Sequence, residues 1–150
     1  MPARPSTTAA RLATAIALSL AASGAAAEVV ATKAWVRATV PGQQTTGAFV
    51  TLTSSEPARL VGVSSPAAKI AELHASEQSG GVMRMHAVDA IALPAGRTVE
   101  LKPGGYHVML IDLRHPVRAG DRVPLVFEVR DAKGRLNRVQ VKADVRPLGR

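Results

Sequence analysis

The feature that most constrains the fold is a strict alternation of apolar and polar residues near the end of the chain. Every second residue from Val123 to Val129 is apolar, and valine and alanine recur at every second position over 139–145. A period of two places each row on one face of a β-strand. The segment 131–134 (Asp-Ala-Lys-Gly) has turn-forming composition, so residues 122–146 are predicted to form a β-hairpin with one buried and one solvated face.

The preceding part of the chain consists of short apolar segments separated by turn-forming residues. No stretch after residue 28 has the 3.6-residue period of a long amphipathic helix. The segments expected as strands are 35–39, 47–53, 60–63, 70–75, 82–88, 91–93, 99–101 and 107–113. This pattern is typical of an all-β antiparallel sandwich or barrel. Because no repeat, linker or low-complexity tract interrupts it, we expect a single domain over residues 28–150.

Residues 1–27 have the composition of a cleaved secretory signal peptide. Arg4 and Arg11 precede an uncharged apolar run from Leu12 to Ala22, and the alanines before Glu28 fit the small-residue rule of signal peptidase. The run is too short to span a bilayer as a helix. We therefore expect a soluble periplasmic protein that begins at Glu28 and has no membrane span.

The sequence contains no cysteine. An exported domain of this kind folds without a disulfide, carries no lipid on an N-terminal cysteine, and cannot form a blue-copper centre, because that centre needs a thiolate ligand. A Gly-x-Ser-x-Gly motif, a phosphate-binding loop and closely spaced catalytic carboxylates are missing as well. These absences predict a binding protein and not an enzyme.

The chain has a formal net charge of +8, and the excess is uneven. Residues 28–113 carry seven basic and seven acidic side chains, whereas residues 114–150 carry ten basic and four acidic ones. The basic excess is either a solvated surface or a docking surface for an acidic partner. Nucleic acid is not expected as a partner, because the signal directs the chain outside and only 3% of residues are aromatic.

Two His/Met pairs stand out, one in segment 74–85 and one in segment 107–109. His107 and Met109 are two residues apart, so on a strand both side chains point to one face. His74 and Met85 flank Ser79-Gly80, and a two-residue turn centred there would place them directly opposite each other. Besides Met1 the methionines are Met83, Met85 and Met109, all in these segments. His86 and His115 are expected to be structural.

Two imidazoles and two thioethers suit one metal in particular. Thioether sulfur is soft and neutral, and it favours Cu(I) over zinc, iron(II) or magnesium. The alternative interpretation is a hydrophobic cluster that contains two hydrogen-bonded histidines. Spacing alone leaves both interpretations open.

The spacing also resembles a known family. His74, ten residues, Met85, twenty-one residues, His107, one residue and Met109 match the pattern of the periplasmic copper chaperones called PCu(A)C. The flanks that agree are Trp35-Val36-Arg37 with Pro41-Gly42, the segments 80–85 and 103–110, and Gly120-Asp121. The resemblance covers about residues 30–130. Two departures are Ala75, where many members carry methionine, and a C-terminal end without histidine or methionine.

The resemblance implies a cupredoxin-like β-sandwich that binds one Cu(I) per chain through His74, Met85, His107 and Met109. It further implies a monomeric metallochaperone that delivers copper to cytochrome c oxidase assembly, either directly to its copper subunit or through a Sco-type thiol protein. The alternatives are a periplasmic copper storage or resistance protein, and a metal-free β-sandwich interaction module.

Overall fold

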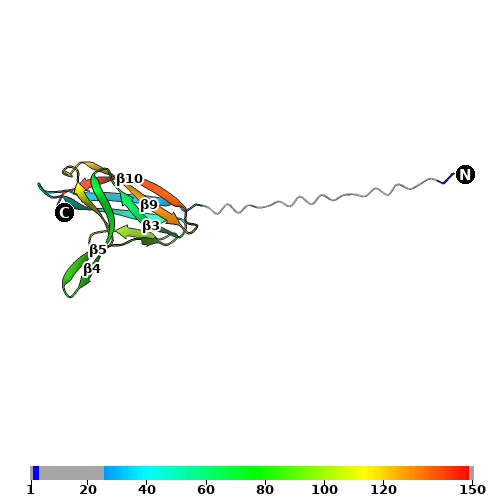
Figure 1. Ribbon diagram of the computed structural model, residues 1–150, viewed down its shortest axis with the longest axis horizontal. Coiled ribbons are helices and arrows are strands. Elements are labelled where there is room, and N and C mark those ends of the chain that lie inside the picture. The colour runs from blue at the N-terminus through cyan, green and yellow to red at the C-terminus, as the bar shows by residue number, and fades with distance from the viewer. Residues whose placement is uncertain (1, 4–25, 149–150) are drawn as a thin grey trace.

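The computed structural model describes residues 2–3 and 26–148, and the described part is all-β, with no helix (Figure 1). The strands are β1 (Val29–Arg37), β2 (Thr45–Ser54), β3 (Ala58–Ser64), β4 (Ala68–Ser79), β5 (Val82–Ala87), β6 (Ile91–Leu93), β7 (Thr98–Leu101), β8 (His107–Leu113), β9 (Arg122–Asp131) and β10 (Leu136–Arg146). The all-β prediction is confirmed. The predicted signal peptide lies almost wholly outside the described residues.

The strands form one hydrogen-bonded sheet that folds over on itself. Its order is β5-β4-β8-β2-β1-β10-β9-β3-β6, and β7 pairs with the second half of β2. Buried side chains of β2 and β8, in one half of this order, and of β3 and β9, in the other half, belong to a single core cluster. The two halves of the sheet therefore form the layers of a sandwich.

The core between the layers is made by the inward rows of the alternating strands. Val123, Leu125, Phe127 and Val129 of β9 are all at most 4% exposed, as the alternation predicts. The largest fully buried side chains are Phe127, Leu52, Leu60, Ile91, Leu93, Leu101, Leu110, Leu125, Val36, Val50, Val108 and Val129. They come from strands of both layers, so burial of apolar surface holds the layers together.

One strand pair departs from the antiparallel arrangement that the sequence predicts. Strands β1 and β10 run parallel, with Trp35 opposite Asp144 and Arg37 opposite Arg146. Two parallel neighbours must be joined by a long stretch of chain. This condition is met because β1 is the first strand in the sequence and β10 is the last. β1 also begins at Val29, earlier than predicted, because an irregularity near Lys33 (φ 53°) interrupts its alternation.

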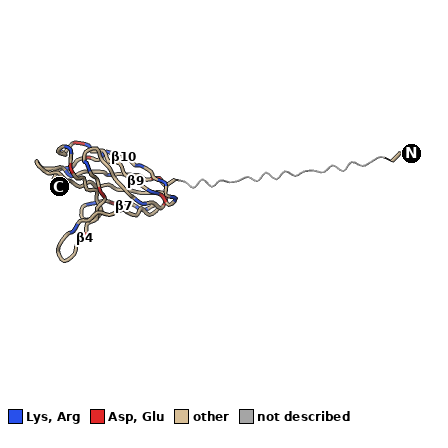
Figure 2. Tube along the Cα trace, viewed as in Figure 1, with Lys and Arg blue, Asp and Glu red and all other residues tan. Residues whose placement is uncertain are grey.

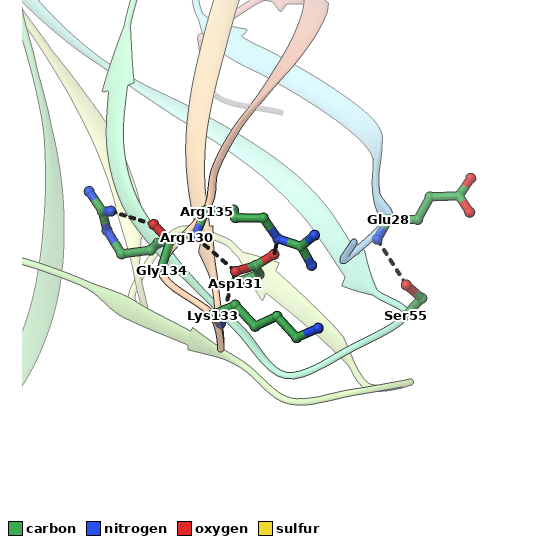
Figure 3. Close-up of polar contacts among 7 residues, drawn as sticks. All are labelled: Glu28, Ser55, Arg130, Asp131, Lys133, Gly134 and Arg135. Carbon is green, nitrogen blue, oxygen red and sulfur yellow. Dashed lines mark hydrogen bonds and ion pairs between the residues drawn. The ribbon is translucent and has the colours of Figure 1, made fainter. Parts of the chain in front are cut away.

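The β9–β10 turn is closed by one carboxylate, that of Asp131 (Figure 3). Its Oδ1 accepts hydrogen bonds from the backbone N–H groups of Lys133 and Arg135, both at 2.9 Å, and its Oδ2 accepts one from Nε of Arg135 at 2.8 Å. Gly134 has a φ of 80°, a value that favours glycine. The turn predicted from residues 131–134 is thus confirmed.

The β4–β5 hairpin projects from the sandwich as a separate arm (Figure 1). Lys and Arg recur along β9 and β10, whereas most of the arm is uncharged (Figure 2). In the described residues, the structure contains no helix of the length and apolarity that crossing a bilayer requires.

Candidate metal centre

The predicted site residues lie on the sheet face that points away from the core. Along β8, Val108 and Leu110 are fully buried in the core, so His107 and Met109 point to the opposite face. The same parity brings Trp35 of β1, Phe49 of β2 and His74 of β4 to this face. Phe49 is 4% exposed but does not belong to the core cluster. These residues form a row across four strands, which we call the outer row: Trp35, Phe49, His107 and His74.

His107 is held by one ring nitrogen, and its other nitrogen has no partner. Its Nδ1 lies 3.1 Å from the carbonyl oxygen of Gly105, which can only accept, so Nδ1 carries the proton. Its Nε2 is buried without a hydrogen-bond partner. The residue is 4% exposed. A buried lone pair of this kind costs free energy unless another atom binds it.

The position of Gly105 follows from local sequence. Residues Lys102 to Gly105 form a tight turn closed by a 3.0 Å bond from Gly105 N–H to the Lys102 carbonyl, with Pro103 second and Gly104 third at a φ of 85°. This is the type II arrangement that proline and glycine favour at those positions. The Gly105 carbonyl also accepts the N–H of Ser76 at 3.2 Å. One carbonyl therefore anchors both His107 and the root of the β4–β5 arm.

His74 has the same arrangement with its two nitrogens exchanged. Its Nε2 lies 2.8 Å from Oε2 of Glu72, and its Nδ1 is buried without a hydrogen-bond partner. An ionised carboxylate accepts only, so Nε2 is the donor and Nδ1 offers a lone pair. His74 is the Cα partner of His107, with ring centroids 5.6 Å apart. The sheet thus brings together two imidazoles that are separated in sequence.

The predicted register of the β4–β5 arm is wrong by two residues. The turn residues are Gly80 and Gly81, so Met85 faces Ser76 while His74 faces Ala87. Both glycines have positive φ, 57° and 76°, as a type I′ turn requires, and Ser79 in the first of these positions would be strained. A register shift of two residues keeps every side chain on the same face of the sheet. Met85 is therefore diagonal to His74 on the same side, at roughly 7–8 Å between Cα atoms for such pairs.

The thioethers and His107 share one open hollow of about 250 Å³. Met83, Met85, Met109 and His107 all line it, with the Ser76 hydroxyl, whose oxygen is also buried and unpartnered. His74 lies beside His107 and is not a lining residue. Met83 and Met85 are 52% and 55% exposed. The hollow therefore joins a buried imidazole to two methionines that are more than half exposed.

The two other histidines lie apart from this cluster. His86 pairs with Ala75 and has the opposite parity to Met85. His115 is exposed and lines a larger hollow of about 410 Å³ with Pro116 and Asp121, and no thioether lines that hollow. Within the described residues, no three side chains of the His, Cys, Asp and Glu types gather as a potential metal site. Only the His/Met cluster therefore offers several metal ligands together in the described chain.

Four residues of the site were not assigned a role from the sequence. Gly47 is the Cα partner of Met109, and a β-carbon there would lie 3.1 Å from Cζ of Phe49, so glycine keeps the hollow open. A glycine inside a strand is a recognised sign of such close approach. Glu72 could have been found from its two-residue spacing to His74. Phe49 and Arg37 line the hollow, and only the strand order reveals this.

The chemistry of the donor set fits one kind of ligand. Two imidazole lone pairs and three thioethers are neutral and comparatively soft, a combination that suits Cu(I) and does not suit magnesium or calcium. The orphaned nitrogens of His74 and His107 provide lone pairs that a metal would satisfy. Fold and site together define a β-sandwich with a His/Met cluster on its outer face.

The sequence comparisons place the chain in a family. The LpqE-like family, described as "Putative lipoprotein LpqE-like", matches residues 29–145, and the chain belongs to this family. A curated relative, "Putative lipoprotein Lxx21020" from Leifsonia xyli subsp. xyli, is 36% identical over 104 residues, which are 69% of this chain and 63% of that protein. The chain thus spans less than two thirds of that relative.

Solved structures confirm the cupredoxin-like fold and the resemblance to PCu(A)C domains. The solution structure of Cu(I)-DR1885 from Deinococcus radiodurans is 34% identical with a TM-score of 0.59, covering 78% of this chain and 76% of that chain. The copper-bound PCuAC domain from PmoF2 is 24% identical with a TM-score of 0.63, covering 79% and 92%. At that lower identity the second likeness concerns the fold alone.

Proposed function

We propose that this chain is an exported copper chaperone that binds one Cu(I) through His74, Met85, His107 and Met109. The observation that carries the proposal is the pair of buried imidazole nitrogens without partners, on adjacent strands beside three thioethers. The 34% identical protein solved as Cu(I)-DR1885 supports it. The chain's role is binding and transfer, with no chemical conversion of a substrate.

The exposure of two methionines favours transfer over storage. Met83 and Met85 are more than half exposed on an arm that projects from the sandwich. An acceptor can therefore reach the metal and replace the thioethers one at a time. A dithiolate acceptor binds Cu(I) more strongly than neutral ligands do, so the transfer of copper to it would lower the free energy.

The destination we propose is cytochrome c oxidase assembly in the periplasm. The acceptor is the copper subunit of the oxidase or a Sco-type thiol protein. This destination follows from the resemblance to PCu(A)C chaperones, and export agrees with the lipoprotein name of the relatives. Met83 lines the same hollow as Met85, where it is either a substitute sulfur or hydrophobic cover, and it is not one of the four proposed ligands.

Competition for Cu(I) with a chromophoric chelator tests the binding site. The parent protein should hold one Cu(I) per chain and bind Cu(II) more weakly, because thioethers favour the soft ion. Met85→Leu with Met109→Leu keeps apolar volume and removes both sulfurs. We expect this double variant to lose at least about tenfold in Cu(I) affinity, or about 1.4 kcal/mol.

Met83→Leu is the matched control, since Met83 lies on the same strand and is as exposed as Met85. It should bind Cu(I) nearly as well as the parent. A double variant that retains parental affinity would show that the thioethers of Met85 and Met109 are not ligands.

A further inference from the structure

Two arginines beside the metal centre, Arg37 and Arg146, differ from Arg122 and Arg138 on β9 and β10. On β9 and β10, Arg122 pairs with Asp144 (3.4 Å from Nε to Oδ1) and Arg138 with Glu128 (3.7 Å from Nε to Oε1). Arg37 and Arg146, by contrast, have no carboxylate within 4.0 Å among the described residues. Their charges are thus not neutralised by a neighbouring ion pair.

Aromatic rings hold these two guanidinium groups in place. Cζ of Arg146 lies 4.8 Å from the centroid of the Trp35 ring, and Cζ of Arg37 lies 5.7 Å from that of Phe49. Trp35 and Phe49 are themselves in contact, with centroids 4.4 Å apart. A guanidinium on a ring face retains N–H donors at its edge. Both arginines are therefore ordered while still able to bind an anion.

The parallel β1–β10 pairing sets the two arginines side by side. Arg37 and Arg146 are Cα partners, so both side chains leave the same face of the sheet. Like charges on adjacent strands repel each other, and an anion placed between them would relieve that repulsion. Arg37 also lines the hollow formed by Met85, His107 and Met109. Any acceptor that reaches those sulfurs therefore meets Arg37.

The surrounding charges reinforce this positive edge. Lys33 and Lys102 line a neighbouring hollow together with Arg146, and Glu100 is the one acidic residue in its lining. On the opposite side of the centre, the Glu72 carboxylate is already bonded to His74. Asp144, which lies opposite Trp35 on the same face as Arg146, is paired with Arg122. The edge of the centre formed by β1 and β10 therefore has an excess of positive charge.

From these observations we infer that Arg37 and Arg146 are the docking site for carboxylate side chains that flank the copper-binding thiols of the acceptor protein. Arginine forms bidentate hydrogen bonds with carboxylates, which fix orientation as well as attract. Such contacts would align the acceptor's thiols with Met85 and accelerate encounter. The inference rests on the proposed copper transfer, and it restricts the docking surface to Arg37 and Arg146, of which only Arg146 belongs to the basic excess of residues 114–150.

The first test needs no copper. The apo protein is titrated with a peptide in which a Ser-x-x-Ser core is flanked by four glutamates, and with the same peptide carrying glutamines. NMR signals of the Nε–H groups of Arg37 and Arg146 should shift with the glutamate peptide only, and less at high salt. Shifts confined to Arg122 and Arg138, or no shifts, would overturn the inference.

The second test measures transfer. Cu(I)-loaded protein is mixed by stopped flow with reduced Cys-x-x-Cys peptides flanked by glutamate or by glutamine, at about 0.01 M and 1 M salt, where the Debye length is about 30 Å and 3 Å. The parent should transfer about tenfold faster or more to the glutamate peptide at low salt. The ratio of the two rates within one variant cancels any change in copper affinity.

Arg37→Gln with Arg146→Gln should bring this ratio close to one, and Arg146→Gln alone should give an intermediate ratio. The control, Arg122→Gln with Arg138→Gln, removes the same charge and should keep most of the preference. Equal losses in both double variants would mean that only net charge matters, and the inference would be wrong. A parent protein that binds no Cu(I) would instead refute the proposed function, while the apo titration would still report on docking.

Discussion

At the scale of single residues, the candidate centre depends on two hydrogen bonds, each of which fixes one ring nitrogen of an imidazole and leaves the other nitrogen free of protein partners. The Gly105 carbonyl binds Nδ1 of His107, and the Glu72 carboxylate binds Nε2 of His74. Each bond selects one tautomer and leaves the other nitrogen's lone pair available. Partners of this kind orient metal-binding histidines and raise their basicity.

Glu72→Ala should therefore weaken Cu(I) binding by about 10–100-fold, the usual cost of losing such a partner. Glu72→Gln retains an acceptor oxygen and should lose less. Nitrogen-15 NMR of the apo protein supplies a second readout: His74 should be the Nε2–H tautomer in the parent and a mixture in Glu72→Ala.

Glu77→Ala is the control for this prediction. Glu77 lies on the same strand, opposite Arg84, and has no hydrogen bond to a histidine. Its replacement should change neither affinity nor tautomer. If Glu72→Ala behaves like the control, the Glu72–His74 bond has no influence on the centre.

At the scale of elements, turns determine where the functional strands begin and which residues face each other. Gly80 and Gly81 set the register of the β4–β5 arm, and Pro103-Gly104 places the carbonyl that holds His107. The β9–β10 turn is stabilised differently, by the side chain of Asp131, which accepts three hydrogen bonds within the turn.

The Asp131 turn gives a pH-dependent prediction. Desolvation by burial would raise the pKa of Asp131, but hydrogen bonds from the Arg135 backbone and guanidinium and from the Lys133 backbone outweigh it, so the pKa is below its ordinary value of 3.8. A carboxyl whose folded pKa is depressed stabilises the fold above its unfolded pKa, and this contribution is lost as pH falls through the folded value. The contribution is therefore complete at neutral pH.

Asp131→Asn should lower the melting temperature by several degrees at neutral pH, because an amide cannot accept all three hydrogen bonds. The difference from the parent should begin to shrink below about pH 4, near the unfolded pKa, and should disappear only once the pH falls below the depressed pKa of the folded carboxyl. Thermal unfolding followed by circular dichroism at several pH values measures both effects. Asp144→Asn, which breaks an exposed pair with Arg122, should change stability little at any pH.

At the scale of the whole molecule, the core and the candidate centre occupy opposite faces of the same strands. On β8 the core receives Val108 and Leu110, and the centre receives His107 and Met109. The apolar burial that holds the sandwich together therefore does not include the proposed ligands. Folding and copper binding should be largely separable.

The apo protein should accordingly be folded, with a β-sheet circular dichroism spectrum and a cooperative melting transition. Free Cu(I) at 100 times the dissociation constant should stabilise it by about 2.7 kcal/mol, a rise in melting temperature on the order of 10 °C. The Met85→Leu, Met109→Leu variant should melt like the parent without copper and show a much smaller rise with it. An apo protein that lacks β structure would contradict this separation.

The sequence by itself determined the local features of this protein. The two-residue period of 123–129 specifies a strand and its buried row, because side chains alternate across any strand whatever its partner. The same rule places the side chains of His107 and Met109 on one face of their strand. Turn chemistry locates the β9–β10 hairpin, although at the β4–β5 arm it also allows Ser79-Gly80, and the structure has the turn at Gly80-Gly81.

Only the tertiary structure decided which strands distant in the sequence are neighbours. It set β4 against β8, so that His74 faces His107, and β1 against β10, so that Arg37 lies beside Arg146. Strand order depends on how the whole core packs and on hydrogen bonds between segments distant in sequence, and the alternation within one strand is the same for any neighbour. The proposed ligands could therefore be chosen from the sequence, and they stay a prediction, whereas the groups that position them and the charged edge beside them could not be found there.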